Sequence, residues 1–237
     1  MSVFASLVDH LADLLQPLFG ASAAAAAIVL FTALVRLLVH PLSRAAARGQ
    51  KARTALQPKV AELRRKHAGN PEKLQRAVLE LHAEEKVSPL SGCLPSLCQL
   101  PAFFLLYHLF SSSSIGGQAN ELLSHQLLAA PLGGRWADAL GDGGVTGGAG
   151  LVYVALFAVV AAVAAFSYRL TKRTMAARPL LPAGDGEAVP GAAAITRVMP
   201  FMSFFTLVTV AVVPLAAALY VVTSTTWSAV ERAFLYR

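Results

Sequence analysis

Blocks of consecutive apolar residues divide this chain, and this pattern restricts the possible folds more than any other feature. Apolar runs of roughly 16 to 22 residues recur along the sequence, which is typical of membrane-spanning helices. Charged residues make up only 14% of the 237 residues, whereas a soluble domain contains about 25%. The sequence therefore predicts an all-α integral membrane protein.

Five apolar blocks define the predicted membrane spans. They cover residues 21–42, 92–110, 150–168, 198–213 and 214–230. The fourth and fifth blocks are short, and Pro214 separates them because proline cannot continue the hydrogen-bond ladder of the preceding helix. We therefore expect the last two spans to form a tight helical hairpin.

Residues 1–20 precede the first span and have a different pattern. Apolar residues recur there at helical spacing with polar residues between them: Phe4, Leu7, Val8, Leu11, Leu14, Leu15 and Leu18. This pattern predicts an amphipathic helix that lies in the membrane interface. A cleaved signal peptide is the alternative, but the segment contains acidic residues and lacks a basic N-terminal region.

The polar stretch 43–89 lies between the first two spans and carries eleven basic and five acidic residues. Leucine and valine recur at helical spacing in both of its halves. Between the halves, Gly69 suits the position just after a helix, Asn70 an N-cap and Pro71 a first helical turn. We expect two antiparallel helices joined by this turn.

The distribution of basic residues predicts the topology. The loop 111–149 contains a single basic residue, whereas the loop 169–197 and the tail 231–237 are basic. Basic loops stay on the cytoplasmic side. We therefore expect a multi-pass membrane protein, with the N-terminus outside and the helical hairpin and C-terminus in the cytoplasm. Topology also explains the net charge of +7 better than nucleic-acid binding does.

Enzyme and metal-site signatures are missing from the sequence. The six histidines are scattered, and no nucleophile elbow or phosphate-binding loop is present. Cys93 and Cys98 lie on different faces of a helix at their spacing. The spans contain essentially no acidic residue, although proton-coupled carriers use buried carboxylates as relays. We expect a protein that is not an enzyme and has no cofactor.

Arg36 interrupts the first span. An arginine at the centre of a bilayer costs roughly 2.5–3.5 kcal/mol on insertion scales. Its side chain could extend to the inner interface, or it could pair with a buried acid, which no span supplies. It could also face a water-filled, protein-lined cavity that is open to the cytoplasm.

Uncharged polar residues accompany Arg36 in the other spans. Gln99 lies in the second span, and hydroxyl residues lie in the fourth and fifth: Ser203, Thr206, Thr209, Thr223, Ser224, Thr225, Thr226 and Ser228. Hydrogen bonds between helices are the ordinary role of such residues. The alternative is that they line the same cavity as Arg36.

Four segments resemble the YidC family of membrane protein insertases. They are "LVRLLVHPLSRAAARGQKARTALQPKVAELRRKH", "EEKVSPLSGCLPSLCQLPAFFLLYHLF", "ITRVMPFMSFF" and "VVPLAAALYVVTSTTWSAVERAFLYR". The resemblance runs in order from Ala21 to Arg237, and its most specific part is Val87–Phe103.

The resemblance implies five core helices around a hydrophilic groove that opens to the cytoplasm and to lipid. The family's groove arginine falls on Arg36, its glutamine on Gln99 and its serine on Ser224. We add Ser203, Thr206 and Thr225 as candidate groove residues. Such proteins insert and help to fold nascent membrane proteins, alone or beside the Sec translocon, and use no nucleotide. The ribosome and the lipid bilayer are further expected partners.

Some features depart from the family pattern. Pro214-Leu215-Ala216 replaces a proline-x-glycine turn, and Thr225 replaces an asparagine. The large extracytoplasmic domain and the basic tail of some members are missing, so docking of the tail to a ribosome is not expected.

The rival interpretations are a secondary transporter or channel, although inverted repeats are not found, and a membrane enzyme with Ser224 as nucleophile.

Overall fold

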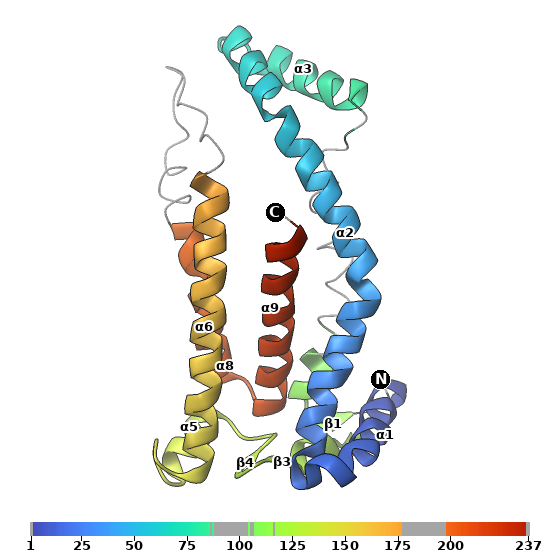
Figure 1. The fold of residues 1–237 in the computed structure, drawn as a ribbon, viewed down its shortest axis with the longest axis vertical. Coiled ribbons are helices and arrows are strands. Elements are labelled where there is room, and N and C mark those ends of the chain that lie inside the picture. Colours follow the sequence, from blue (N-terminus) through green and yellow to red (C-terminus); the bar gives the residue numbers. More distant parts are fainter. Residues whose placement is uncertain are drawn as a thin grey trace.

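The computed structural model describes residues 2–85, 87, 104, 107–115, 117–176 and 198–235. Its helices run mainly along one long axis (Figure 1). The helical elements are α1 (Ser2–Phe19), η1 (Gly20–Ser22), α2 (Ala23–Lys66), α3 (Pro71–Glu84), η2 (Glu121–Ser124), α5 (Trp136–Gly141), α6 (Gly148–Ala176), η3 (Met199–Phe204), α8 (Phe205–Val212) and α9 (Leu215–Leu235). The strands are β1 (Ser114–Ile115), β2 (Gln118–Ala119), β3 (Gln126–Leu127) and β4 (Ala130–Pro131).

α2 is a single helix of 44 residues that contains Pro41 and Pro58. We predicted a membrane span over residues 21–42 and a two-helix hairpin after it. α2 joins that span to the first helix of the hairpin without a break, and the membrane boundary near residue 42 stays a prediction. The proline ring fixes φ near its helical value, so a proline removes one backbone hydrogen bond without forcing the helix to end. The predicted first span and the first arm of the predicted hairpin therefore form one continuous helix.

The turn between α2 and α3 follows the local signals in the sequence. The side chain of Asn70 accepts a hydrogen bond of 3.0 Å from the backbone N–H of Lys73, and Pro71 begins α3. These two predictions are confirmed. Gly69 was expected to occupy the left-handed position after α2, but α2 is capped by His67 and the φ of Gly69 is not positive.

Pro214 separates α8 from α9, as predicted. Val213 leaves the helix with an extended ψ of 157°, and α9 begins at Leu215. The fourth predicted span begins as the 3-10 helix η3 and becomes α-helical only at Phe205. α6 continues to Ala176, beyond the predicted end of the third span at residue 168.

One end of the molecule, which we call the loop end, is built from α1, residues 111–147 and the first turns of α9. Two short antiparallel pairs, β1 with β2 and β3 with β4, lie there, and α5 contacts α6 and α8. The opposite end is formed by the tip of α2 and by α3, and we call it the hairpin end. Figure 1 shows that the two ends are separated by most of the length of α2.

Carbonyl groups of the loop end cap the start of α9. The backbone N–H of Leu215 donates to the carbonyl of Gly134 and that of Ala216 to the carbonyl of Leu132, both at 2.9 Å. The hydroxyl of Tyr153 on α6 also donates to the Gly134 carbonyl, at 2.6 Å. The first N–H groups of a helix lack partners within it, so the loop satisfies them and fixes α9 against α6.

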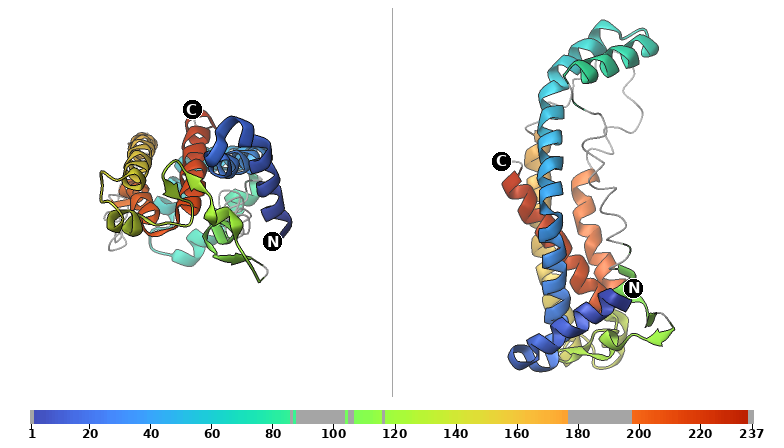
Figure 2. Two further views of the ribbon diagram at one scale, coloured as in Figure 1. Left: turned by 90° about the horizontal axis from the view of Figure 1, so that it is seen from below. Right: turned by 90° about the vertical axis from the view of Figure 1, so that its right-hand side faces the viewer.

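α9 lies between α2 and α6 and contacts both (Figures 1 and 2). α1 packs against α2 through Val8 and Ala12, while Leu7, Leu14 and Leu18 are exposed. Two helical segments of the described chain, Ser6–Lys66 and Gly148–Met175, are long and apolar enough to cross a membrane, and Pro200–Val212 is a shorter apolar helix. The described fold is mostly helical and fits an all-α membrane protein.

Candidate functional site

Arg36 of α2 reaches across to α9 and binds Ser224. Its Nε donates to the Ser224 hydroxyl oxygen at 2.9 Å, and one of its terminal guanidinium nitrogens donates to the same oxygen. Ser224 is only 4% exposed and also shares a hydrogen bond with the hydroxyl of Tyr220. The structure thus brings together two of the predicted site residues. Because serine is neutral, this contact orients the guanidinium without neutralising its charge.

A second polar contact lies near the first, toward the hairpin end. His40 Nδ1 and Glu231 Oε1 are 2.5 Å apart, and the Glu231 side chain is 13% exposed. Glu231 also interacts electrostatically with Arg36. We expected no acid near Arg36 and assigned residue 231 to a cytoplasmic tail. The first expectation is corrected: α9 continues to Leu235 and packs against α2, so Glu231 lies near Arg36. The cytoplasmic location of residue 231 stays a prediction.

These five residues form what we call the polar seam between α2 and α9. Arg36 and His40 are four residues apart, and Tyr220, Ser224 and Glu231 are spaced by four and seven. Helical periodicity places residues at such spacings on one face. Sequence reasoning missed His40, Tyr220 and Glu231, although their spacing from Arg36 and Ser224 was a usable signal.

The hydroxyl residues of the last two helices mostly bond to their own helix. Thr225 Oγ1 donates to the Val221 carbonyl at 2.8 Å, and Thr209, Thr223 and Ser228 also donate to the carbonyl four residues before them. We expected bonds between helices or water-filled surroundings for this set. Short hydroxyl side chains reach the preceding turn of their own helix easily, whereas Ser224 accepts hydrogen bonds from Arg36 on another helix.

The remaining candidate groove residues lie elsewhere. Ser203 is on η3 and Thr206 is on α8, and both are half-buried. η3 and α8 pack on α6, and α8 also contacts α9. Gln99, Cys93 and Cys98 lie outside the described residues, as does most of the predicted second span. The structure therefore pairs Arg36 with Ser224 and leaves the other candidate residues as predictions.

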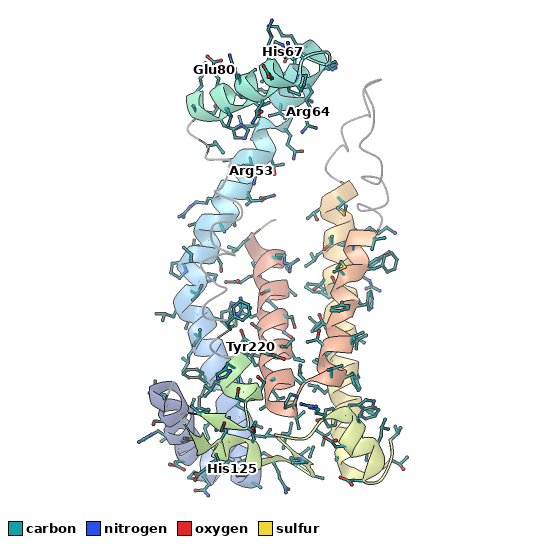
Figure 3. All side chains as sticks on the ribbon, turned by 180° about the vertical axis from the view of Figure 1, so that it is seen from behind. Arg53, Arg64, His67, Glu80, His125 and Tyr220 are labelled. Atoms are coloured by element: carbon teal, nitrogen blue, oxygen red, sulfur yellow. The ribbon has the colours of Figure 1, made fainter. Side chains whose placement is uncertain are left out.

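Within the described ranges, no group of three or more His, Cys, Asp or Glu side chains is arranged to hold a metal ion. The charged side chains gather instead at the hairpin end. Figure 3 shows Arg53 and Arg64 on α2 and Glu80 on α3 there, far from His125 at the loop end. Lys59 on α2 donates to Glu85, which directly follows α3, and so joins the two arms.

A sequence profile of the family described as "60Kd inner membrane protein" matches residues 14–237. The chain belongs to this family. Curated relatives named membrane protein insertase YidC align with shorter parts of it. The protein of Clostridium perfringens is 44% identical over 84 residues, which are 35% of this chain and 35% of that protein.

Two further relatives carry the same name. That of Chlorobium phaeovibrioides is 39% identical over 100 residues, 42% of this chain and 17% of its own length. That of Geobacter sulfurreducens is 40% identical over 81 residues, 34% of this chain and 15% of its own length. The aligned part thus spans between 15% and 35% of these relatives. The resemblance found in the sequence is confirmed, and the chain is a member of a family of inner membrane proteins.

Proposed function

We propose that this chain is a membrane protein insertase and chaperone, not an enzyme or a solute carrier. Its relatives are named membrane protein insertases. The observation that carries the proposal is the contact between Arg36 and Ser224, which holds a positive charge inside the first predicted span. A cation within an apolar span marks a functional site, and a neutral partner leaves its charge available for a substrate.

The proposed mechanism uses that charge on an incoming chain. A nascent membrane protein must move a polar, often acidic, leading segment partway across the bilayer. A hydrophilic groove lined by Arg36, Gln99, Ser203, Thr206, Ser224 and Thr225 shortens the apolar barrier for this segment. Arg36 attracts an acidic group by roughly 4 kcal/mol at about 4 Å with an effective dielectric near 20, and by less where water screens it. The substrate's apolar helix then moves sideways into lipid.

Reconstitution tests the role of Arg36. Vesicles would contain this protein or a variant and receive two single-span substrates, whose leading segments differ only in aspartates or asparagines. We expect Arg36→Ala to lower protease protection of the acidic substrate roughly tenfold and that of the neutral one much less. Arg36→Lys should keep most of the activity, because the mechanism needs charge more than a guanidinium fork.

An equal loss for both substrates, with the variant still abundant, would contradict an action of the charge on the substrate. A labelled-solute uptake assay on the same vesicles distinguishes the rival function. Uptake without insertion would identify a transporter or channel.

We further propose five spans, with the N-terminus outside and the hairpin of residues 43–89 in the cytoplasm. There the hairpin would meet the substrate, the ribosome or the Sec translocon, and its many basic residues suit such partners. A cysteine at Gly143 should react with an impermeant maleimide in intact cells, whereas one at Gly69 should not. Labelling at Gly69 alone would reverse the orientation.

A further inference from the structure

Glu231 is the one acidic residue in the described part of the chain that is not exposed to solvent. The other acids there lie on the surface of α1, the hairpin or the loop end, whereas Glu231 faces α2 with 13% of its side chain exposed. Burying a carboxylate is costly unless it is paired. The proposed attraction between Arg36 and the substrate does not use Glu231, so its position needs a separate explanation.

The ion pairs of the described residues leave Arg36 without a carboxylate partner. Lys59 pairs with Glu85, and the carboxylate of Glu231 contacts the His40 ring. Arg36 donates to the neutral Ser224 and experiences Glu231 only at longer range. A substrate carboxylate that approaches Arg36 therefore competes with a carboxylate that the protein already carries nearby.

His40 determines where that resident carboxylate lies. His40 Nδ1 and Glu231 Oε1 are 2.5 Å apart, which is within hydrogen-bond distance. His40 is one helical turn beyond Arg36, on the side of the hairpin end. The bond therefore keeps Glu231 beside Arg36 and prevents it from pairing directly with the guanidinium.

We propose that Glu231 is a specificity-determining residue of the insertion site, a resident carboxylate that limits how strongly Arg36 attracts acidic segments, and that His40 is the positioning residue that holds it off the guanidinium. This inference rests on the proposed insertase function. It assigns the degree of preference for acidic over neutral leading segments to the polar seam rather than to Arg36 alone.

A binding assay tests the inference separately from insertion. The probes are dye-labelled peptides with one apolar helix, preceded by either two aspartates or two asparagines, and the readout is the ratio of their affinities for the protein in nanodiscs. Glu231→Gln should raise the preference for the acidic peptide roughly threefold to tenfold, because a unit negative charge near Arg36 is removed. His40→Phe should lower the preference, since Glu231 can then pair with Arg36.

The double variant His40→Phe with Glu231→Gln should behave as Glu231→Gln alone, because His40 acts only through Glu231. Glu121→Gln, the same chemical change at an exposed acid of the loop end, is the matched control and should leave the ratio unchanged. An unchanged ratio in Glu231→Gln, or an equal change for both peptides, would overturn the inference. Vesicle insertion of the same two segments, run alongside, separates this result from a failure of the insertase function.

Discussion

The two ends of the molecule are built on different principles, although one helix runs through both. At the loop end, Leu122, Leu132 and the start of α9 from Leu215 to Ala218 are at most 1% exposed. At the hairpin end, α3 has no buried residue, and among the described residues of the hairpin only Ala47 and Leu56 of α2 are buried. The loop end is a packed core, whereas the hairpin end is a pair of helices joined by polar contacts.

This difference shows that a helix of this protein can form without being packed against the rest of the fold. α2 keeps its helical geometry from a buried environment to an exposed one, so local propensity and capping are sufficient at the hairpin end. Elements with few buried contacts open at low free energy. We therefore expect substitutions to affect the global stability of the protein at the loop end and only local order at the hairpin end.

The largest expected effect is from Leu132→Ala. This side chain is fully buried beside the start of α9, and its truncation should lower the free energy of unfolding by about 2–5 kcal/mol. Leu79→Ala on α3, where the leucine is 54% exposed, is the matched control and should cost less than about 0.5 kcal/mol. Thermal unfolding in detergent measures both, and comparable shifts would remove the distinction between the two ends.

A smaller effect is expected from Asn120→Ala. The buried amide of Asn120 donates to the carbonyls of Leu109 at 2.8 Å and Ser112 at 3.0 Å. Removal of this donor takes a hydrogen-bond partner from the carbonyl of the buried Leu109, which should lower the free energy of unfolding by about 1–3 kcal/mol. The same unfolding assay tests this, with the exposed Ser124→Ala as control. An Asn120 variant as stable as the parent would show that water replaces the amide and that the loop end is less tightly packed.

Asn70→Ala should act only locally. Loss of the N-cap costs about 1 kcal/mol of helix stability, so the amides in the first turns of α3 should exchange with deuterium several-fold faster. The unfolding temperature should not change, because α3 buries nothing that the rest of the fold needs. A lowered unfolding temperature would mean that the hairpin is a docked structural part.

The contact between Lys59 and Glu85 should have the smallest effect. The hydrogen bond to Glu85 and its negative charge raise the pKa of Lys59 above its ordinary value. The contact is therefore fully present below the ordinary lysine pKa and is lost as the pH rises through the raised pKa. Spin labels at Glu62 and Glu80 should report a broader distance distribution at pH 11 than at pH 8. The Lys59→Gln variant should show a broad distance distribution at both pH values. A distribution in that variant as narrow as that of the parent at pH 8 would contradict a role for the pair.

Local signals in the sequence predicted the chain breaks well. Asn70, Pro71 and Pro214 act through the backbone within a few residues of themselves, so their effects can be read without knowing the fold. The continuity of α2 was missed because a proline in a helix does not always end it. The small strands of the loop end were missed because two-residue pairs carry no periodic pattern.

The candidate site was predicted only in part, because local sequence signals identify single residues but not their contacts across helices. Arg36 was found as a charge inside an apolar span, and the family resemblance matched Ser224 to the same groove. The contacts of both residues depend on how α2 and α9 pack. His40 and Glu231 are separated by 191 residues, and no local rule connects them. Thr209, Thr223, Thr225 and Ser228 bond to the preceding turn of their own helix, and a groove-lining role of such hydroxyl groups stays a prediction.

Pro41 directly follows His40, between the polar seam and the hairpin end, and the consequence is mechanical. It cannot donate the hydrogen bond to the carbonyl four residues earlier, so α2 is most easily bent at this point, one residue from the contact with Glu231. From Pro41 to Lys66 the helix extends about 38 Å at 1.5 Å per residue, and a bend of about 10° at Pro41 displaces its tip by about 7 Å. We therefore expect α2 to bend at Pro41. The segment after Pro41 then moves at the hairpin end, while the segment before it stays packed in the core at the loop end.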